Sequence, residues 1–395
     1  MKLLKGLLSA ALAVMLTAAP ISVNASAFSI RTDLSLTAEC GSGSSNFDSV
    51  EAAAIYVRDC IRNRDNTIKF SLPIRYDFEE AFHSIILQAV DETYSGSEGD
   101  YIKYVLKSIE CKGGYDGVNY YYTINMNYYT NAEQERYVDR RVSEILSSLD
   151  LDGKDDYAKI SAIYEYIINN VKYDYSDDES NKARFTAYGA LYNGKAVCQG
   201  FSQLFYRMAK ELGLSCRIIS GTADGGHAWN IVAVDGIYYY VDTTWDIFNS
   251  DISDCDYFMR GSLDFDEADR TTPHIASGKD PKNFLITDFT SAEFKAAYPV
   301  SDYAYDAEKK QIGYVLGDVN SDGVVDSADA SEILNGYAMI SIYNYSGMTA
   351  AQELAADVDR SKSIDSSDAS AVLDYYGYVS TGGKLSLEEY NKKVK

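Results

Sequence analysis

Cys198 begins a predicted amphipathic helix, and this position favours nucleophilic chemistry. The short run Asn193-Gly194-Lys195-Ala196 precedes it, and the apolar residues that follow share one helix face: Phe201, Leu204, Phe205, Met208 and Leu212. A cysteine in the first turn of a helix lies among unpaired backbone N–H groups at the positive end of the helix dipole, which favours thiolate over thiol. The alternative is that Cys198 is a small buried apolar side chain, as most isolated cysteines are.

A predicted hairpin places a histidine and an aspartate on one sheet face. Asp235-Gly236 separates two apolar runs and is typical of a two-residue turn. In that register Trp229 faces Asp242, and His227 is the diagonal neighbour of Asp242. If the helix that begins at Cys198 covers this face, His227 can take the thiol proton while Asp242 orients the imidazole. Alone, His227 fits a buried core histidine and Asp242 a strand-end cap, but the three residue types in consistent geometry favour catalysis.

The elements before Cys198 carry no recognisable chemistry. Residues 28–149 indicate mixed helix and strand: helices around 50–61 and 81–90, strands over 68–72 and 118–128, and a helix that begins at Asn131. This region is expected either to support the thiol domain or to contact its substrate. A further helix, DYAKISAIYEYIINNVKYD, leads toward Cys198. His83 is expected to be structural, and His274, which has polar neighbours, is expected to be a loop residue.

Composition limits the function classes. The formal net charge is −23, from 36 Lys+Arg and 59 Asp+Glu, which argues against nucleic acid or an anionic membrane as partner. Residues 1–27 have the pattern of a secretory signal peptide, and no later segment has the roughly 20 apolar residues of a membrane span. We therefore expect a secreted, extracellular protein. The six cysteines show no metal-binding spacing, and no disulfide is predicted.

The last eighty residues contain an acidic repeat. GDVNSDGVVDSADASEIL begins at Gly317, and ADVDRSKSIDSSDASAVL begins 39 residues later. Each unit has oxygen-bearing residues at the positions of a twelve-residue calcium loop, followed by an apolar helix. The predicted ligands are Asp318, Asn320, Asp322, the Val324 carbonyl, Asp326 and Asp329 in the first loop, and Asp357, Asp359, Ser361, the Ser363 carbonyl, Asp365 and Asp368 in the second.

The two loops differ from each other and from an EF-hand. Gly323 serves the turn of the first loop, whereas Lys362 stands at the same position of the second, and Ser361 replaces a carboxylate there, so the second site is expected to be weaker. Both loops end in Asp instead of Glu, and no helix is predicted before either loop. The alternative is that these segments are acidic surface turns that bind no metal. Two matching loops at this spacing argue against that alternative.

Two families resemble parts of this chain. KAVCQGFSQLF, GHAWNIVAVDG and YYVDTTWD resemble the three sequence blocks of the transglutaminase-like superfamily, over residues 150–265 and up to about 305. This resemblance implies a papain-like α+β fold and thiol acyl chemistry with Cys198 as nucleophile, His227 as base and Asp242 as orienting acid. The paired loops resemble a type I dockerin, which implies calcium binding and docking to a cohesin of a cellulosome scaffold through Ser327-Ala328 and Ser366-Ser367.

We therefore expect an α+β protein with a papain/transglutaminase-like catalytic core. The expected order is a signal peptide (1–27), an N-terminal α/β region (28–149), the transglutaminase-like domain (150–305), a linker (306–316), a small two-loop helical dockerin (317–380) and a tail (381–395). Three functions stay open: a thiol acyltransferase or amide hydrolase acting on protein or peptide, a cysteine peptidase proper, and a non-catalytic binding domain. The intact triad argues against the third.

Overall fold

The computed structural model describes residues 29–33, 45–176, 180–280, 283–307, 314–343, 345–361 and 363–394. The expected signal peptide and Cys40 lie outside these residues, as do Lys362 and most of the expected linker. The chain forms two compact units. The first comprises residues up to Val232 with Val241–Phe258 and Asp269–Ser291, and the second comprises Ala233–Tyr240, Met259–Ala268 and Ala292–Lys395. The N-terminal region and most of the expected thiol domain thus share one unit.

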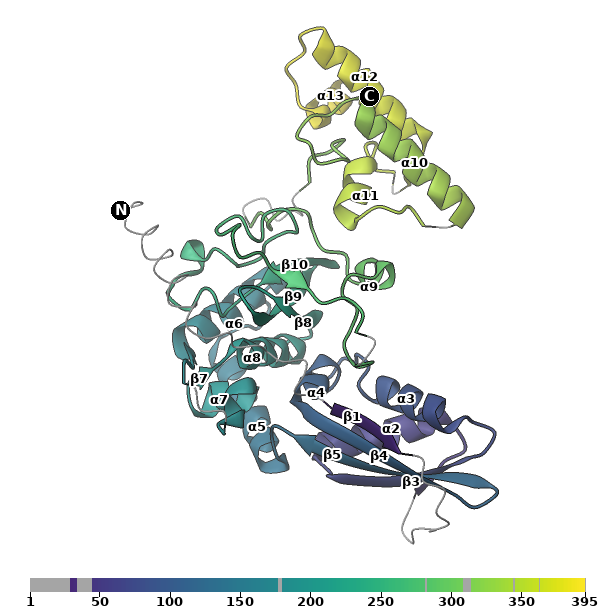
Figure 1. Ribbon diagram of the computed structural model, residues 1–395. Coiled ribbons are helices and arrows are strands. Elements are labelled where there is room, and N and C mark those ends of the chain that lie inside the picture. Colours follow the sequence, from purple (N-terminus) through teal and green to yellow (C-terminus); the bar gives the residue numbers. More distant parts are fainter. Residues whose placement is uncertain are drawn as a thin grey trace. The chain divides into compact units, whose positions relative to one another are not determined.

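A five-stranded sheet forms the N-terminal part of the first unit (Figure 1). Its order is β1-β4-β5-β3-β2, with antiparallel pairing between β4, β5 and β3 and parallel pairing at both edges. The bounds are β1 (Ser29–Asp33), β2 (Ser45–Asn46), β3 (Thr67–Pro73), β4 (Leu106–Tyr115) and β5 (Asn119–Tyr128). The strands predicted over 68–72 and 118–128 are confirmed as β3 and β5. β4 was not predicted, because KSIECKGG mixes lysines and glycines with only a few apolar residues.

The predicted helices of this region are confirmed. They are α2 (Val50–Asn63), α3 (Phe78–Ala89) and α5 (Ala132–Ser148), and a short helix, α4 (Asp100–Val105), precedes β4. Asn131 is the N-cap of α5 and accepts bonds from two first-turn N–H groups. A stack of three rings, Phe78, Tyr122 and Phe70, joins α3 to the sheet with centroid separations of 4.5 and 4.8 Å.

Helix α8 (Cys198–Glu211) is the central element of the first unit. The sequence predicts one buried face, but every residue from Cys198 to Ala209 is buried. The polar residues of the other face are enclosed because they have partners: the Gln203 side chain donates to the carbonyls of Tyr104 and Phe185, and Arg207 pairs with Asp139 at 2.6 Å. The helix ends at Glu211 with Leu212 as its C-cap, and Gly213, which was the predicted cap, follows with a φ of 76°.

Two further helices of the thiol region, α6 (Asp156–Asn170) and α7 (Ala187–Tyr192), pack on α8. A four-stranded sheet has the order β10-β9-β8-β11, and its strand β8 also contacts α8. Its strands are β8 (Cys216–Thr222), β9 (Gly226–Val234), β10 (Ile237–Val241) and β11 (Ile275–Ala276). Smaller elements are η2 (Lys182–Phe185), β6 (Lys172–Tyr173), β7 (Lys195–Ala196), η3 (Ile252–Asp254) and α9 (Ala292–Ala297).

The predicted hairpin is confirmed. β9 and β10 are neighbours in the sheet and are joined by Asp235 and Gly236 alone, with φ values of 52° and 85°. Two consecutive positive φ angles are those of a type I′ turn, which Asp-Gly favours. The register across this pair, with Trp229 opposite Asp242, stays a prediction.

The C-terminal part of the second unit is helical. α10 (Ser327–Tyr343) and α12 (Ser366–Ser380) follow the two acidic loops as predicted and contact each other. Two expectations were wrong. A helix, α11 (Ala350–Ala356), ends immediately before the second loop, and the expected tail contains α13 (Leu387–Val394). Leu387 is 4% exposed in one apolar core with Val319, Ile333 and Val372, so burial of this side chain orders the segment. No helix within the described ranges is long and apolar enough to cross a membrane.

The position of Leu387 gives a prediction for stability. Leu387→Ala removes buried apolar volume and should destabilise the helical C-terminal part by about 2–4 kcal/mol. Amide hydrogen exchange of α10 and α12, measured in the full chain, should accelerate accordingly. Leu373→Ala is the matched control, because Leu373 is 47% exposed on α12. Equal exchange in the two variants would mean that α13 does not stabilise this core.

Candidate active site

Cys198 occupies the first position of α8. Its neighbour Val197 is the extended N-cap, with φ −97° and ψ 174°, and provides no side-chain cap, so the first-turn N–H groups stay unbonded by any capping side chain. The thiol is buried, at 1% exposure. Gly200 permits this placement: a Cβ there would lie 2.7 Å from the Ala196 side chain and 2.9 Å from the Arg184 carbonyl oxygen. The cysteine therefore sits at a tightly packed turn at the positive end of a helix.

His227 on β9 lies between Cys198 and Asp242. Its Nε2 is 2.7 Å from Asp242 Oδ2, and the Cys198 thiol is near enough to the imidazole to raise its pKa. Since Nε2 faces the carboxylate, Nδ1 is the ring nitrogen left for the thiol. His227 is 5% exposed and Asp242 is 1% exposed. The structure thus brings together the three residues that the sequence predicted as a triad.

The two buried ionisable groups shift each other's pKa in opposite directions. Burial of the imidazole by itself would lower its pKa, but the charge and hydrogen bond of Asp242, with the hydrogen bond of Cys198, raise the pKa of His227 to about 10. Burial would raise the pKa of Asp242, but His227 and His274 hold it well below its ordinary value. An imidazolium beside a carboxylate is therefore the stable form at neutral pH.

His274 is a site residue that the sequence analysis missed. It lies in a loop, as expected, but its side chain is 1% exposed and its Nε2 is 3.3 Å from the same Asp242 Oδ2. Its ring centroid lies 4.5 Å from that of Trp245 and 5.0 Å from that of Trp229. The sequence signal is weak, because only the two residues of β11 follow it before the chain turns away.

A close backbone approach brings His274 to the site. β11 pairs with β8, where Ala276 lies opposite Gly221, and Gly221 in turn lies opposite His227 on β9. A Cβ at Gly221 would be 2.0 Å from the Ile275 carbonyl oxygen. Glycine at this position therefore allows β11, and His274 before it, to lie beside β8.

A second layer of hydrogen bonds fixes the segment that carries Asp242. The Thr244 N–H donates to Asp242 Oδ1 at 2.8 Å, and the Tyr164 hydroxyl donates to the Asp242 carbonyl oxygen at 2.8 Å. Tyr164 also donates to Asp246, which accepts from the N–H groups of Asp256 and Tyr257 at 3.0 Å each. Burial, with the nearby Asp242 charge, raises the pKa of Asp246 to about 6. These contacts prevent Asp242 from turning away from His227.

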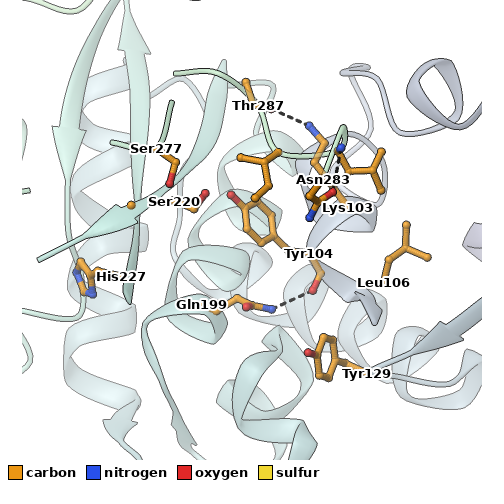
Figure 2. A pocket seen from close by; sticks show the side chains of 13 residues that line it. Lys103, Tyr104, Leu106, Tyr129, Gln199, Ser220, His227, Ser277, Asn283 and Thr287 are labelled. Atoms are coloured by element: carbon orange, nitrogen blue, oxygen red, sulfur yellow. Dashed lines mark hydrogen bonds between the residues drawn. The ribbon is translucent and has the colours of Figure 1, made fainter. Parts of the chain in front are cut away.

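A cavity of about 120 Å³ adjoins His227 (Figure 2). Its wall includes Gln199, the residue after Cys198, and Lys103 and Tyr104 at the end of α4. The Gln199 side-chain amide donates to the Tyr104 carbonyl oxygen at 2.9 Å. The N-terminal region therefore contributes directly to the surroundings of the candidate triad, which the sequence left open.

The acidic loops have a donor set that fits calcium. In the second loop, ligand atoms of Asp357, Asp359 and Asp368 lie within 4.8 Å of one another. In the first, Asp318 accepts bonds from the N–H groups of Asp322 and Gly323, both within the loop. Hard oxygen ligands on a tight loop are those that Ca²⁺ prefers. His227, Asp242 and His274 form a further cluster of metal-ligating side chains, although the two contacts to Asp242 are those of hydrogen bonds.

Similar proteins match only part of the chain. Kyphoscoliosis peptidase of Mus musculus is 28% identical over 118 residues, and that of Homo sapiens is equally similar. Each alignment covers 26% of this chain and 18% of the relative, so the chain spans less than a fifth of the relatives' length.

Two solved structures overlap with the chain over limited parts. One described as "Crystal structure of a TGase" is 14% identical and covers 51% of this chain and 60% of its own, with a TM-score of 0.25. A putative cysteine protease from Cytophaga hutchinsonii is 17% identical and covers 32% and 53%, with a TM-score of 0.24. Structural similarities this low support neither a fold nor a function for this chain.

Two family models match in the order that the sequence predicted. Residues 144–243, which contain Cys198, His227 and Asp242, match the transglutaminase-like superfamily, and residues 316–375, which contain both acidic loops, match the dockerin type I domain. Type I dockerin domains bind calcium, in agreement with the donor set of the loops. The chain is therefore an α+β protein with a transglutaminase-like region followed by a type I dockerin.

Proposed function

We propose that this protein is a secreted, cellulosome-associated thiol enzyme that acts on amide bonds of proteins or peptides. The observation that carries the proposal is the proximity of three buried residues: Cys198 at the N-terminus of α8, His227 beside it, and Asp242 hydrogen-bonded to His227. This arrangement has a nucleophile, a base and a group that orients the base, in contact order.

The chemistry follows from these contacts. Because His227 already holds a proton as the imidazolium, Cys198 reacts as the thiolate, which attacks the amide carbonyl carbon to form a tetrahedral intermediate. The Cys198 N–H, at the positive end of α8, would stabilise the negative oxygen. Collapse breaks the C–N bond while His227 gives its proton to the leaving amine. The thioester is then released by water or by a second amine, which regenerates the thiol.

A cysteine peptidase is the second candidate. The matched relatives from Mus musculus and Homo sapiens are both described as peptidases. Incubation with glutamine-containing proteins, with and without a labelled primary amine, separates the possibilities by mass spectrometry. Amine incorporation supports an acyltransferase, deamidation supports an amide hydrolase, and new chain ends support a peptidase. No modified product with any substrate would leave a non-catalytic binding domain.

We propose calcium as ligand of the two acidic loops and a cohesin as partner of the dockerin. Ser327-Ala328 and Ser366-Ser367 lie exposed in the first turns of α10 and α12, where a partner can reach them. Export through the signal pattern of residues 1–27 would deliver the chain to an extracellular, calcium-containing medium. The net charge of −23 argues against nucleic acid or an anionic membrane as a partner.

The nucleophile assignment predicts selective alkylation. Burial raises the pKa of Cys60 to about 11 and that of Cys111 to about 12, and it also raises the pKa of Cys216 and of Cys255. Thiols whose pKa is raised are mostly un-ionised at pH 7 and react slowly. Iodoacetamide should therefore label Cys198 first, and His227→Ala should slow that labelling at least about tenfold. Similar rates at Cys198 and Cys216 would contradict the assignment.

The orienting role of Asp242 predicts a pH effect. Asp242 keeps the pKa of His227 at about 10, so the imidazolium is retained up to that pH and lost above it. Asp242→Asn removes the charge, so the pH above which turnover declines should move to lower values, because the imidazolium that protonates the leaving amine is lost earlier. Turnover itself should fall by a large factor, on the order of 10⁴ in a Ser-His-Asp triad. Unchanged turnover and an unchanged pH profile in Asp242→Asn would make Asp242 a structural residue.

The loops predict an ordered response to calcium. Chelation should leave each loop with several mutually repelling carboxylates, so EDTA should unfold residues 317–380 and abolish cohesin binding while α8 and its sheet stay folded. Each loop has four Asp ligands, but only the first has a glycine, Gly323, at its sharp turn, so on addition of calcium this loop should fill before the loop with Ser361. Calorimetry of Asp318→Ala and Asp357→Ala, each removing the first ligand of one loop, assigns the two binding steps. Tighter binding at the second loop would contradict this order.

A further inference from the structure

The cavity beside His227 differs in charge from the rest of the protein. None of the 13 residues that line it is Asp or Glu, although the chain has 59 acidic and 36 basic residues. Lys103 is part of the wall, and His227 stands at the opposite end in Figure 2. A cavity wall without carboxylates is therefore a local exception in a protein of net charge −23.

The charge of Lys103 is only partly compensated by its neighbours. Lys103 Nζ is 3.2 Å from Asp100 Oδ1 and 3.1 Å from the Thr287 hydroxyl. Asp100, which is fully buried, is at the same time bonded by Arg217 at 2.8 and 3.1 Å. The Ile218 N–H adds a third bond to this carboxylate at 2.9 Å. Because Arg217 already engages both Asp100 oxygens, the lysine charge is left with one shared contact.

The neighbouring ion pairs do not neutralise the Lys103 charge. Glu92 lies 3.5 Å from Arg217 Nε and 3.6 Å from Lys210 Nζ. Three cations (Lys103, Arg217 and Lys210) thus surround two carboxylates (Asp100 and Glu92). Burial and the Asp100 charge raise the pKa of Glu92 to about 7, which reduces its negative charge at neutral pH. The group has a net charge of at least +1, and Lys103 is its member at the cavity wall.

The rest of the wall combines apolar side chains with polar groups, which suits a side chain that has an apolar stem and a polar end. Leu106, Leu285 and Ile286 supply the apolar part, and polar groups of Tyr104, Ser220 and Gln199 also line the cavity. Gln199 immediately follows the candidate nucleophile, so a group in this cavity is next to the reacting amide. The cavity volume, about 120 Å³, corresponds to one side chain and not to a folded partner.

We propose that this cavity is a specificity subsite for an acidic residue of the peptide substrate, adjacent to the amide that Cys198 attacks. Lys103, supplied by the N-terminal region, recognises the carboxylate. The proposal rests on the proposed thiol chemistry, because the subsite is defined relative to the reacting amide. It also gives residues 28–149 a role in substrate selection.

Two alkylating probes test the subsite without any need for turnover. They are N-bromoacetyl-glutamic acid α-amide and N-bromoacetyl-glutamine α-amide, which have the same shape and differ in one charge. In each case the Cys198 thiolate displaces bromide and forms a thioether. The ratio of the two rates, divided by the ratio for free cysteine, should be about fivefold or more in favour of the acidic probe. It should fall as salt is added.

Variants assign this preference to Lys103. Lys103→Gln removes the charge and should lower the ratio about fivefold, whereas Lys103→Arg should retain it. Lys107→Gln is the matched control, because Lys107 is exposed four residues away and does not line the cavity. The rate with neutral bromoacetamide reports whether each variant keeps its fold.

The outcomes separate this proposal from the proposed function. A wild-type ratio no greater than that of free cysteine would overturn the subsite, whatever the stability of the variants. An equal loss in Lys107→Gln and Lys103→Gln would do the same. If the two probes give the expected rate ratio but no amide is turned over, the subsite is supported and the proposed enzymatic function is contradicted. If amides are turned over but the two probes react at equal rates, the proposed enzymatic function stands and the subsite for an acidic residue is contradicted.

Discussion

The buried negative charge of Asp242 is the constraint on which the site depends. A carboxylate at 1% exposure is stable only when its charge and lone pairs are satisfied. Here two imidazoles share one oxygen and a backbone N–H bonds the other. The Asp242 carboxylate in turn raises the pKa of His227 to about 10, so this one buried charge also determines the protonation of the imidazole beside it. The tyrosine and aspartate behind it, Tyr164 and Asp246, hold the segment that carries this charge.

Helix α8 connects this charge to the rest of the first unit. Its apolar face packs as the sequence periodicity predicts, and its polar face is buried through bonds to the N-terminal region. Cys198 is thus positioned by contacts of α8 that reach from β8 to α4 and α5. A substitution far from the thiol, such as one at Arg207, would act on Cys198 through this helix.

Local patterns predicted the elements whose residues are close in sequence. The Asp235-Gly236 turn, the Gly213 helix end and the Asn131 cap each depend on a few adjacent residues, and all are present. His274 could not be predicted in this way, because its partner Asp242 is 32 residues distant and only a two-residue strand aligns it. α13 was missed for a similar reason, since the burial of Leu387 depends on residues up to about 70 positions earlier. The Lys103 charge depends on Asp100 and Arg217, which are 117 residues apart.

The pair formed by Asp100 and Arg217 has a consequence for how the modules of this chain can be recombined. The sequence places a domain boundary near residue 150, and a protein engineer would cut there to isolate the thiol domain. Such a cut would remove Asp100. Arg217, which is 6% exposed, would then be a buried cation without its closest counter-charge. Residues 45–149 are therefore best regarded as inseparable from the transglutaminase-like region, and a fusion that includes this region should retain them.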